Sequence, residues 1–310
     1  MTHGRSAYTL VELMVVLAII SILIAMSTTG LMYLRRSAAG IDQANDLRQI
    51  GLAWSQYNVD SRGKFVAGWL SRKSQQDMRL VLTYPDDVVI PPAPTFDNSL
   101  PETAGPWTWR LAHYLDNDLE PMLDQDMRDI MPITDYAERG EHIAFHPAFA
   151  YNGWYVGGHY EISHDHNRPT LEFSRAPLAD RTYKNVVAES LGRMQHPTST
   201  FVFMPGAFMA KAGPWGISDA DSFGPNWFEV TPPILADQPL WTQLSMDDIE
   251  TLRDDVAIPR LGLNQRIPVF FADGHVSTQS MTDLMNQSHW IDAAKQVEDI
   301  PAGSFTHEAR

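Results

Sequence analysis

The sequence contains no cysteine, which excludes a disulfide framework and a thiolate metal site. Basic side chains are few as well: 23 lysines and arginines stand against 38 acidic residues, for a formal net charge of -15. This balance argues against nucleic acids and anionic lipid surfaces as the main partners. Internal repeats and low-complexity tracts are also absent. At 310 residues the chain is long enough for one large domain or two small ones.

Motifs that would indicate an enzyme are missing too. The chain has no HExxH helix, no GxSxG nucleophile elbow, no P-loop and no GxGxxG turn. Serines and histidines are present, but no such motif selects a triad among them. The sequence therefore predicts neither catalysis nor a resident cofactor.

Charge is absent from Leu13 to Leu34, a stretch that directly follows Glu12. About 20 apolar residues span a bilayer as a helix. An ionised carboxylate in such a span costs roughly 2.5–3.5 kcal/mol on insertion scales. Glu12 therefore either lies at the membrane interface without consequence or has a partner.

A cleaved secretory signal is the first alternative for this stretch. Its apolar core would have about 7–15 residues and would end in small residues. Ser27 to Gly30 imitate such an end, but apolar character resumes from Leu31 to Leu34. The length of the stretch favours a retained helix.

The short basic leader, the sequence Tyr-Thr-Leu-Val-Glu and the apolar helix together resemble the processing signal of type IV pilins and type II secretion pseudopilins. The resemblance implies that a prepilin peptidase cuts between Ala7 and Tyr8 and that Tyr8 is then N-methylated. Alanine stands here where the family usually has glycine, and tyrosine where it usually has phenylalanine. In the family, the glutamate at the position of Glu12 pairs with the methylated amino group of a neighbouring subunit and sets the axial register.

Apolar residues recur at helical spacing beyond the span, from Ile41 to Tyr57. One helix is therefore expected to continue to about Asp60 and to stop near Gly63. This divides the chain into a leader (1–7), a transmembrane or filament-core half-helix (8–34), an amphipathic half-helix (35–60) and a globular domain (61–310). Basic residues flank the span on both sides, so the orientation rests on the resemblance, which implies an inner-membrane anchor and a periplasmic domain.

Asp273 and Gly274 separate two runs of strand-forming residues and predict a β-hairpin. The sequence PTSTFVF reads as a further strand, and residues 107–116 read as a short helix. The fold class predicted from these elements is α+β: a long N-terminal helix packed on an antiparallel sheet, with large loop-rich insertions, as in pilins.

Four segments resemble one subfamily of pilin-like proteins, which combines the processing signal with a Phe-Ala-Asp-Gly-His-Val hairpin near the other end. They are residues 7–12, 47–53, 107–116 and 271–276. Many members also have a histidine ten residues before the hairpin aspartate, where this chain has Leu263. That difference weakens any function assigned to the histidine and leaves the fold prediction intact.

Two clusters could hold a metal ion. His159, His164 and His166, in the sequence HYEISHDH, suit zinc, although a solvated polar loop is the favoured interpretation. Asp219 and Asp221 faintly resemble a calcium loop, in a stretch that also contains Glu229. This stretch fails as an EF-hand, and a structural calcium ion stays an open alternative. We expect no metal site.

Asp273 and His275 could also suggest catalysis, but turn chemistry explains them better. The nine tryptophans are interpreted as core residues, with a carbohydrate-binding platform as the alternative. The function predicted is that of a pseudopilin or minor pilin in a type II secretion or type IV pilus-like filament. Its partners would be the prepilin peptidase, other pilin subunits and the inner-membrane assembly platform. The alternative is a membrane-tethered module that binds carbohydrate or another envelope ligand.

Overall fold

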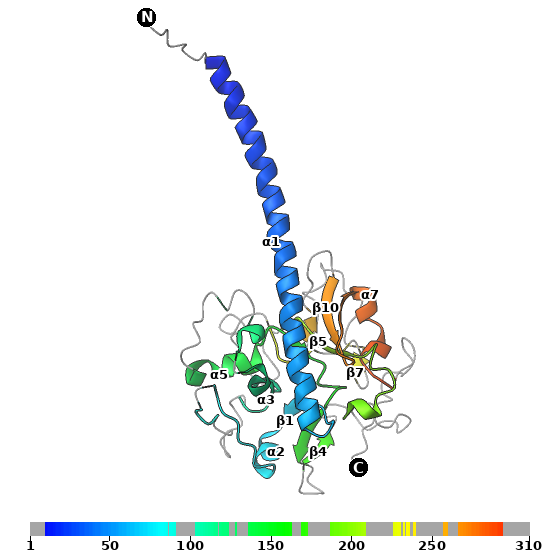
Figure 1. Ribbon diagram of the computed structural model, residues 1–310. Coiled ribbons are helices and arrows are strands. Elements are labelled where there is room, and N and C mark those ends of the chain that lie inside the picture. Colours follow the sequence, from blue (N-terminus) through cyan, green and yellow to red (C-terminus); the bar gives the residue numbers. More distant parts are fainter. Residues whose placement is uncertain are drawn as a thin grey trace, which may run out of the picture. The chain divides into compact units, whose positions relative to one another are not determined.

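The computed structural model describes residues 10–85, 87–90, 103–116, 118–123, 128, 136–162, 169–172, 187–208, 226–230, 232, 234–235, 238–239, 257–259 and 266–293. The chain divides into two compact units, residues 1–43 and 44–310. Helix α1 (Leu10–Asp60) contributes to both, and the other elements belong to the second unit (Figure 1). The remaining helices are α2 (Arg72–Asp77), α3 (Thr108–Ala112), α5 (Tyr136–Phe145) and α7 (Met281–Leu284), with 3-10 turns η1 (His113–Leu115), η2 (Glu120–Met122), η3 (Leu191–Arg193) and η6 (Gln287–His289).

The end of α1 at Asp60 confirms the prediction from periodicity. Two hydrogen bonds close the helix, from Gly63 N to Asn58 O (2.6 Å) and from Arg62 N to Val59 O (3.2 Å). These are the two bonds of a Schellman motif. The residue in the left-handed position that usually takes glycine is Arg62 (φ 58°), and Gly63 follows with φ 83°. Gly63, the glycine that the sequence suggested as the helix stop, thus lies one residue beyond the left-handed position.

The second half of α1 buries the apolar stripe that its periodicity predicts. Leu47, Ile50 and Trp54 are each at most 1% exposed. The indole of Trp54 stacks on Phe65 with 4.8 Å between ring centroids and meets Phe270 edge-on at 6.0 Å. Burying each such side chain stabilises the fold by about 1.5–3 kcal/mol. This half of the helix is therefore a core element of the second unit.

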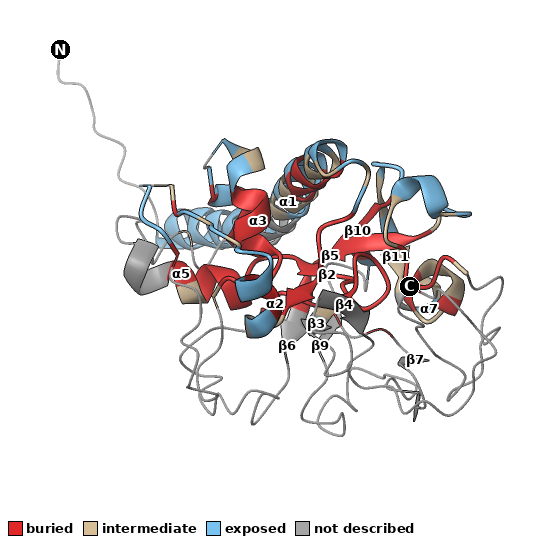
Figure 2. Cartoon of the chain, turned by 90° about the horizontal axis from the view of Figure 1, so that it is seen from below, coloured by how far each residue is buried: buried red, intermediate tan, exposed pale blue. Residues whose placement is uncertain are grey.

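The main sheet has four antiparallel strands in the order β11-β10-β5-β2, with bounds Val276–Ser280, Arg266–Phe271, Phe201–Met204 and Ala150–Tyr151. Phe270 pairs with Phe203, which in turn pairs with Tyr151. All three side chains are buried, and Figure 2 shows β2, β5 and β10 in the buried class. An α+β architecture with an antiparallel sheet that includes the predicted hairpin is therefore present.

A second sheet differs from the expectation of antiparallel pairing alone. Its order is β1-β3-β4, with bounds Trp69–Leu70, His159–Ile162 and Pro169–Glu172, and β1 pairs parallel to β3. Parallel neighbours need a long crossover connection. The chain between β1 and β3 contains α2, α3 and α5 and supplies it. Two further ribbons pair β6 (Gly206–Phe208) with β9 (Ala257–Pro259) and β7 (Ile234–Leu235) with β8 (Gln238–Pro239).

The predicted hairpin forms, but its loop is longer than two residues. Beyond the pair Phe270–Val276, a backbone hydrogen bond from Phe271 N to His275 O (3.0 Å) closes a three-residue loop, inside which Gly274 N donates to Phe271 O (2.9 Å). Gly274 has φ 97°, whereas Asp273 is not among the residues with positive φ. A turn followed by one left-handed residue is the common three-residue hairpin loop. Only the glycine, therefore, uses the conformational freedom that the Asp-Gly pair suggested.

Three tryptophans that could have lined a binding platform lie in the core instead. Trp107, Trp109 and Trp227 are 0%, 2% and 6% exposed. Their burial is supported by hydrogen bonds from Trp107 Nε1 to Phe228 O (2.6 Å) and from Trp109 Nε1 to Gly140 O (3.0 Å). The platform alternative is wrong for these three residues. Trp215 lies outside the described residues.

Candidate functional site

The N-terminal part of α1 is an exposed apolar cylinder. Residues 10–28 have a mean hydropathy of 2.7, and none of them is buried. Within the described part of the chain, this is the one helix segment long and apolar enough to cross a membrane. In water, so much exposed apolar surface would be strongly unfavourable. The segment fits a single-pass membrane anchor.

The polar side chains of this segment are satisfied inside the helix. Ser21 and Ser27 donate their hydroxyls to the carbonyls of Leu17 and Leu23, both at 2.7 Å, and Thr28 donates to Ala25 at 2.9 Å. A hydroxyl that bonds its own helix needs no water. Because these three hydroxyls are bonded within the helix, the segment can face lipid or another apolar helix without an unsatisfied polar group from them.

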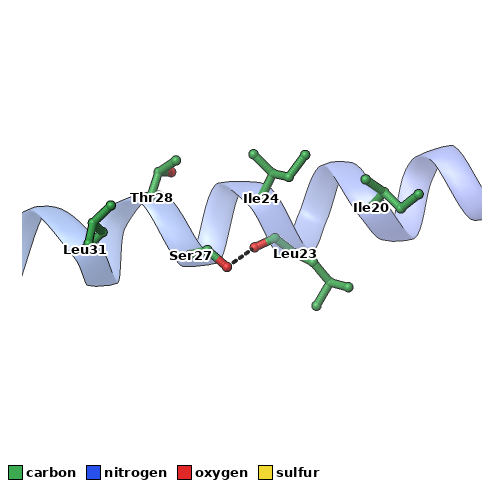
Figure 3. A pocket seen from close by; sticks show the side chains of 6 residues that line it. All are labelled: Ile20, Leu23, Ile24, Ser27, Thr28 and Leu31. Atoms are coloured by element: carbon green, nitrogen blue, oxygen red, sulfur yellow. Dashed lines mark hydrogen bonds between the residues drawn. The ribbon is translucent and has the colours of Figure 1, made fainter.

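One face of the segment forms a shallow groove (Figure 3). The close view shows Ser27 turned toward the carbonyl of Leu23, with the aliphatic side chains spread along the helix. Small residues on such a face allow another helix to approach closely. The groove is lined by Ile20, Leu23, Ile24, Ser27, Thr28 and Leu31.

Glu12 is exposed and lies in the first turn of α1. The unsatisfied N–H groups of a helix N-terminus favour a negative charge there by about 0.3–1 kcal/mol. Ala7 and Tyr8, the predicted cleavage residues, lie outside the described residues.

Residues 2–28 match the family model of the prokaryotic N-terminal methylation motif. The match covers Ala7, Tyr8 and Glu12 together with the apolar segment. No curated protein and no solved structure matches the chain. The methylation motif supports a pilin-like protein that is a substrate of prepilin peptidase. Because this motif marks structural proteins, it also supports a structural role over a catalytic one.

The second group of predicted residues forms the tip of the β10–β11 hairpin. Asp273 Oδ1 lies 2.5 Å from His275 Nδ1 and accepts a hydrogen bond from the backbone N–H of His275 (3.2 Å). The imidazole stacks on Phe271 with 4.1 Å between centroids. Asp273 therefore shapes the turn and orients His275. This geometry agrees with the preference for turn chemistry over catalysis.

The structure joins two residues that the sequence placed in separate metal clusters. His159 Nε2 lies 2.7 Å from Glu229 Oε1, and both side chains are buried. The ring of Trp154 lies 4.5 Å from that of His159. The pair links β3 to the segment 226–230. Because the partners are 70 residues apart, no local pattern in the sequence could have indicated this contact.

The other metal candidates, His164, His166, Asp219 and Asp221, lie outside the described residues. Within the described ranges, no three or more histidine, aspartate or glutamate side chains are placed to hold a metal ion together. Glu229, from the calcium-like stretch, is bonded to His159 instead. The described residues therefore give no support to the histidine cluster or to the calcium-like stretch as a metal site.

Sequence reasoning missed a pair of histidines at the end of α5. His142 and His146 are 8% and 6% exposed, and their ring centroids are 5.1 Å apart. Their spacing of four residues in EHIAFH was the available signal, since such residues share a helix face. His146 Nδ1 lies 2.6 Å from the carbonyl of Asn226. Burial lowers the pKa of His146 to about 4, the hydrogen bond to Asn226 opposes this, and His142 lowers the pKa further.

Proposed function

We propose that this chain is a pseudopilin or minor pilin, a structural subunit of a filament of the type II secretion or type IV pilus class. The single observation that carries the proposal is the methylation motif at residues 2–28, which coincides with an exposed apolar helix. Prepilin peptidase would cut between Ala7 and Tyr8 and methylate the amino group of Tyr8.

The proposed organisation follows the helix. Residues 1–7 form the leader, 8–34 the membrane and filament-core half of the helix, and 35–60 its amphipathic half. The globular domain, 61–310, would lie in the periplasm, with the chain anchored in the inner membrane. Its assembly partners would be other pilin-like subunits and the inner-membrane platform. In support, α1 is apolar and exposed over residues 10–28 and contributes buried residues from Leu47 onward.

Glu12 would pair with the methylated amino group of Tyr8 on a neighbouring subunit. In the low dielectric of packed apolar helices, a charge without its partner is costly, so the pair favours one axial stagger. The proposal requires no catalytic group. Nor do the buried tryptophans support the alternative of a carbohydrate-binding module, because Trp107, Trp109 and Trp227 lie in the core.

Mass spectrometry of the N-terminal peptide tests the processing step. The chain is expressed with and without a prepilin peptidase, and a peptide that begins at N-methylated Tyr8 is expected only with the enzyme. An intact N-terminus in both samples, or cleavage near Gly30, would contradict the proposal.

A variant pair tests assembly. Glu12→Ala is expected to be cleaved and inserted normally but to be absent from sheared filaments. The control is Asp42→Ala, which removes an exposed carboxylate from the same helix outside the apolar segment and should assemble as the wild type does. Normal incorporation of Glu12→Ala would refute the role of this residue.

A further inference from the structure

We propose that two apolar patches of the unit 44–310 bind each other between neighbouring copies of this chain, in a head-to-tail contact. The helix patch is the outer face of α1 around Leu52 and Val59. The ribbon patch consists of Met78, Val81, Val88 and Val89. The inference rests on the proposed function and deepens it, because it assigns surfaces through which the subunits of a filament would meet.

The exposed large apolar side chains of this unit are concentrated rather than scattered. In its described part, all of them except Leu191 belong to one of the two patches. Val59 and Val81 are the most exposed of these side chains, at 78% and 69%. Single exposed apolar side chains are normal on a protein surface, whereas contiguous ones mark interaction sites. Both patches are therefore candidate contact surfaces.

The ribbon patch lies on the outer face of a short antiparallel ribbon. Thr83 pairs with Val89, and two backbone hydrogen bonds of 2.9 Å and 2.8 Å flank this pair. Because side chains alternate along a strand, Val81 shares the outer face with Thr83 and Val89. The inner face holds the half-buried Leu82 and the buried Tyr84 and Ile90. Outward positions of such a ribbon are commonly polar, but here valines occupy two of the three.

The helix patch occupies the side of α1 that turns away from the core. Leu52 and Val59 are 63% and 78% exposed, and their spacing of seven residues places them on one helix face. The other exposed residues of α1 from 45 to 59 are Asn45, Arg48, Gln49 and Gln56. None of these exposed residues is acidic, although the chain has 38 acidic residues. Depletion of charge is typical of the centre of an interface.

The charges at the two patches are opposite in sign. Arg48 is the one charged residue among the exposed residues of the helix patch, where it donates to Asn45 Oδ1 at 3.0 Å. The ribbon patch is flanked by two exposed acids, Asp77 and Asp87, and by one exposed base, Arg79. The helix patch of one copy therefore attracts the ribbon patch of the next, whereas two copies of the same patch would bring like charges together.

A contact between two different patches does not close on itself. Each copy that binds through one patch still offers the other, so the contact repeats and builds a filament instead of a dimer. Small patches suffice for this purpose if the copies are anchored in one membrane, because tethering raises their effective concentration.

Cysteine cross-linking tests the contact, because the chain has no cysteine of its own. Leu52→Cys and Val89→Cys are placed in separately tagged full-length chains, which are expressed together with a prepilin peptidase and oxidised in isolated membranes. The product that carries both tags should be roughly tenfold more abundant than the dimers formed by either variant alone. In the control, Gly192→Cys replaces Val89→Cys. Residue 192 is exposed outside both patches, and a Cβ there meets nothing within 4 Å, so little mixed product is expected.

Charge reversal tests the complementarity of the two patches. Arg48→Glu in the chain with Leu52→Cys should lower the yield of the mixed product about threefold, and Asp77→Lys in the chain with Val89→Cys should restore it. Absence of a mixed product, or equal cross-linking of Val89→Cys with itself, would overturn the inference. The N-terminal peptide from the same membranes tests the proposed function separately. Methylated Tyr8 without a mixed product would refute the contact and leave the proposed function standing.

Discussion

Gly51 of α1 lies directly against the aromatic ring of Phe270 in β10. A Cβ atom at residue 51 would overlap three carbon atoms of that ring. The contact joins the segment 47–53 to the strand that runs into the hairpin motif at 271–276. Two sequence motifs from opposite ends of the chain therefore meet in one core.

Gly51→Ala should destabilise the globular unit. Overpacking typically costs about 1–3 kcal/mol, and alanine returns up to about 1 kcal/mol through its helix propensity. Chemical denaturation in detergent would measure the loss. Gly40→Ala is the matched control, because a Cβ at residue 40 meets nothing within 4 Å and should leave stability unchanged or higher. Equal effects of the two substitutions would contradict the steric explanation.

Arg62→Gly should stabilise the end of α1. Arg62 is exposed and has φ 58°, a conformation that costs a residue with a side chain about 1–2 kcal/mol and costs glycine almost nothing. The greater freedom of glycine in the unfolded chain cancels part of this gain. We expect a net rise in the free energy of unfolding of about 0.5 kcal/mol. Arg48→Gly, in the middle of the same helix, should lower it instead.

Acid should weaken the packing around His146. Its pKa is lowered from 6.5 to about 4 in the folded chain, chiefly by burial. The unfolded chain therefore binds more protons between these values, and stability present at neutral pH falls as the pH drops from about 6.5 to about 4. The maximum loss is about 3 kcal/mol. Urea denaturation in EDTA at pH 7.5 and pH 5 should show a smaller drop for His146→Gln than for the wild type.

The buried bond between His159 and Glu229 should be sensitive to truncation. Glu229→Ala removes the acceptor of a 2.7 Å contact and leaves a buried ring nitrogen without it, at a cost of about 1–3 kcal/mol. Glu229→Gln retains an oxygen that accepts from Nε2–H and should cost less. Thermal unfolding of both variants, measured beside the wild type, checks the order. The same melting temperature for all three would show that the contact does not stabilise the fold.

Local patterns in the sequence were enough to predict several elements of this chain. The apolar run, Glu12 at its head and the periodicity up to Tyr57 predict a single helix that ends at Asp60, because helix period and caps are local properties. The Asp-Gly pair likewise predicts the β10–β11 hairpin. The methylation motif is also a local feature, confined to residues 2–28.

Contacts between distant residues were decided by the tertiary structure. The parallel pairing of β1 with β3, the bond between His159 and Glu229, and the approach of Gly51 to Phe270 each join residues far apart in the chain. The cap at Arg62 is local, yet it departs from the usual glycine because one unfavourable residue is tolerated when packing holds the helix end. The sequence by itself thus determined the apolar helix, its methylation motif and the hairpin, since these depend on neighbouring residues. The tertiary structure alone decided which buried polar groups contact each other, because these groups come from segments that are far apart in the chain.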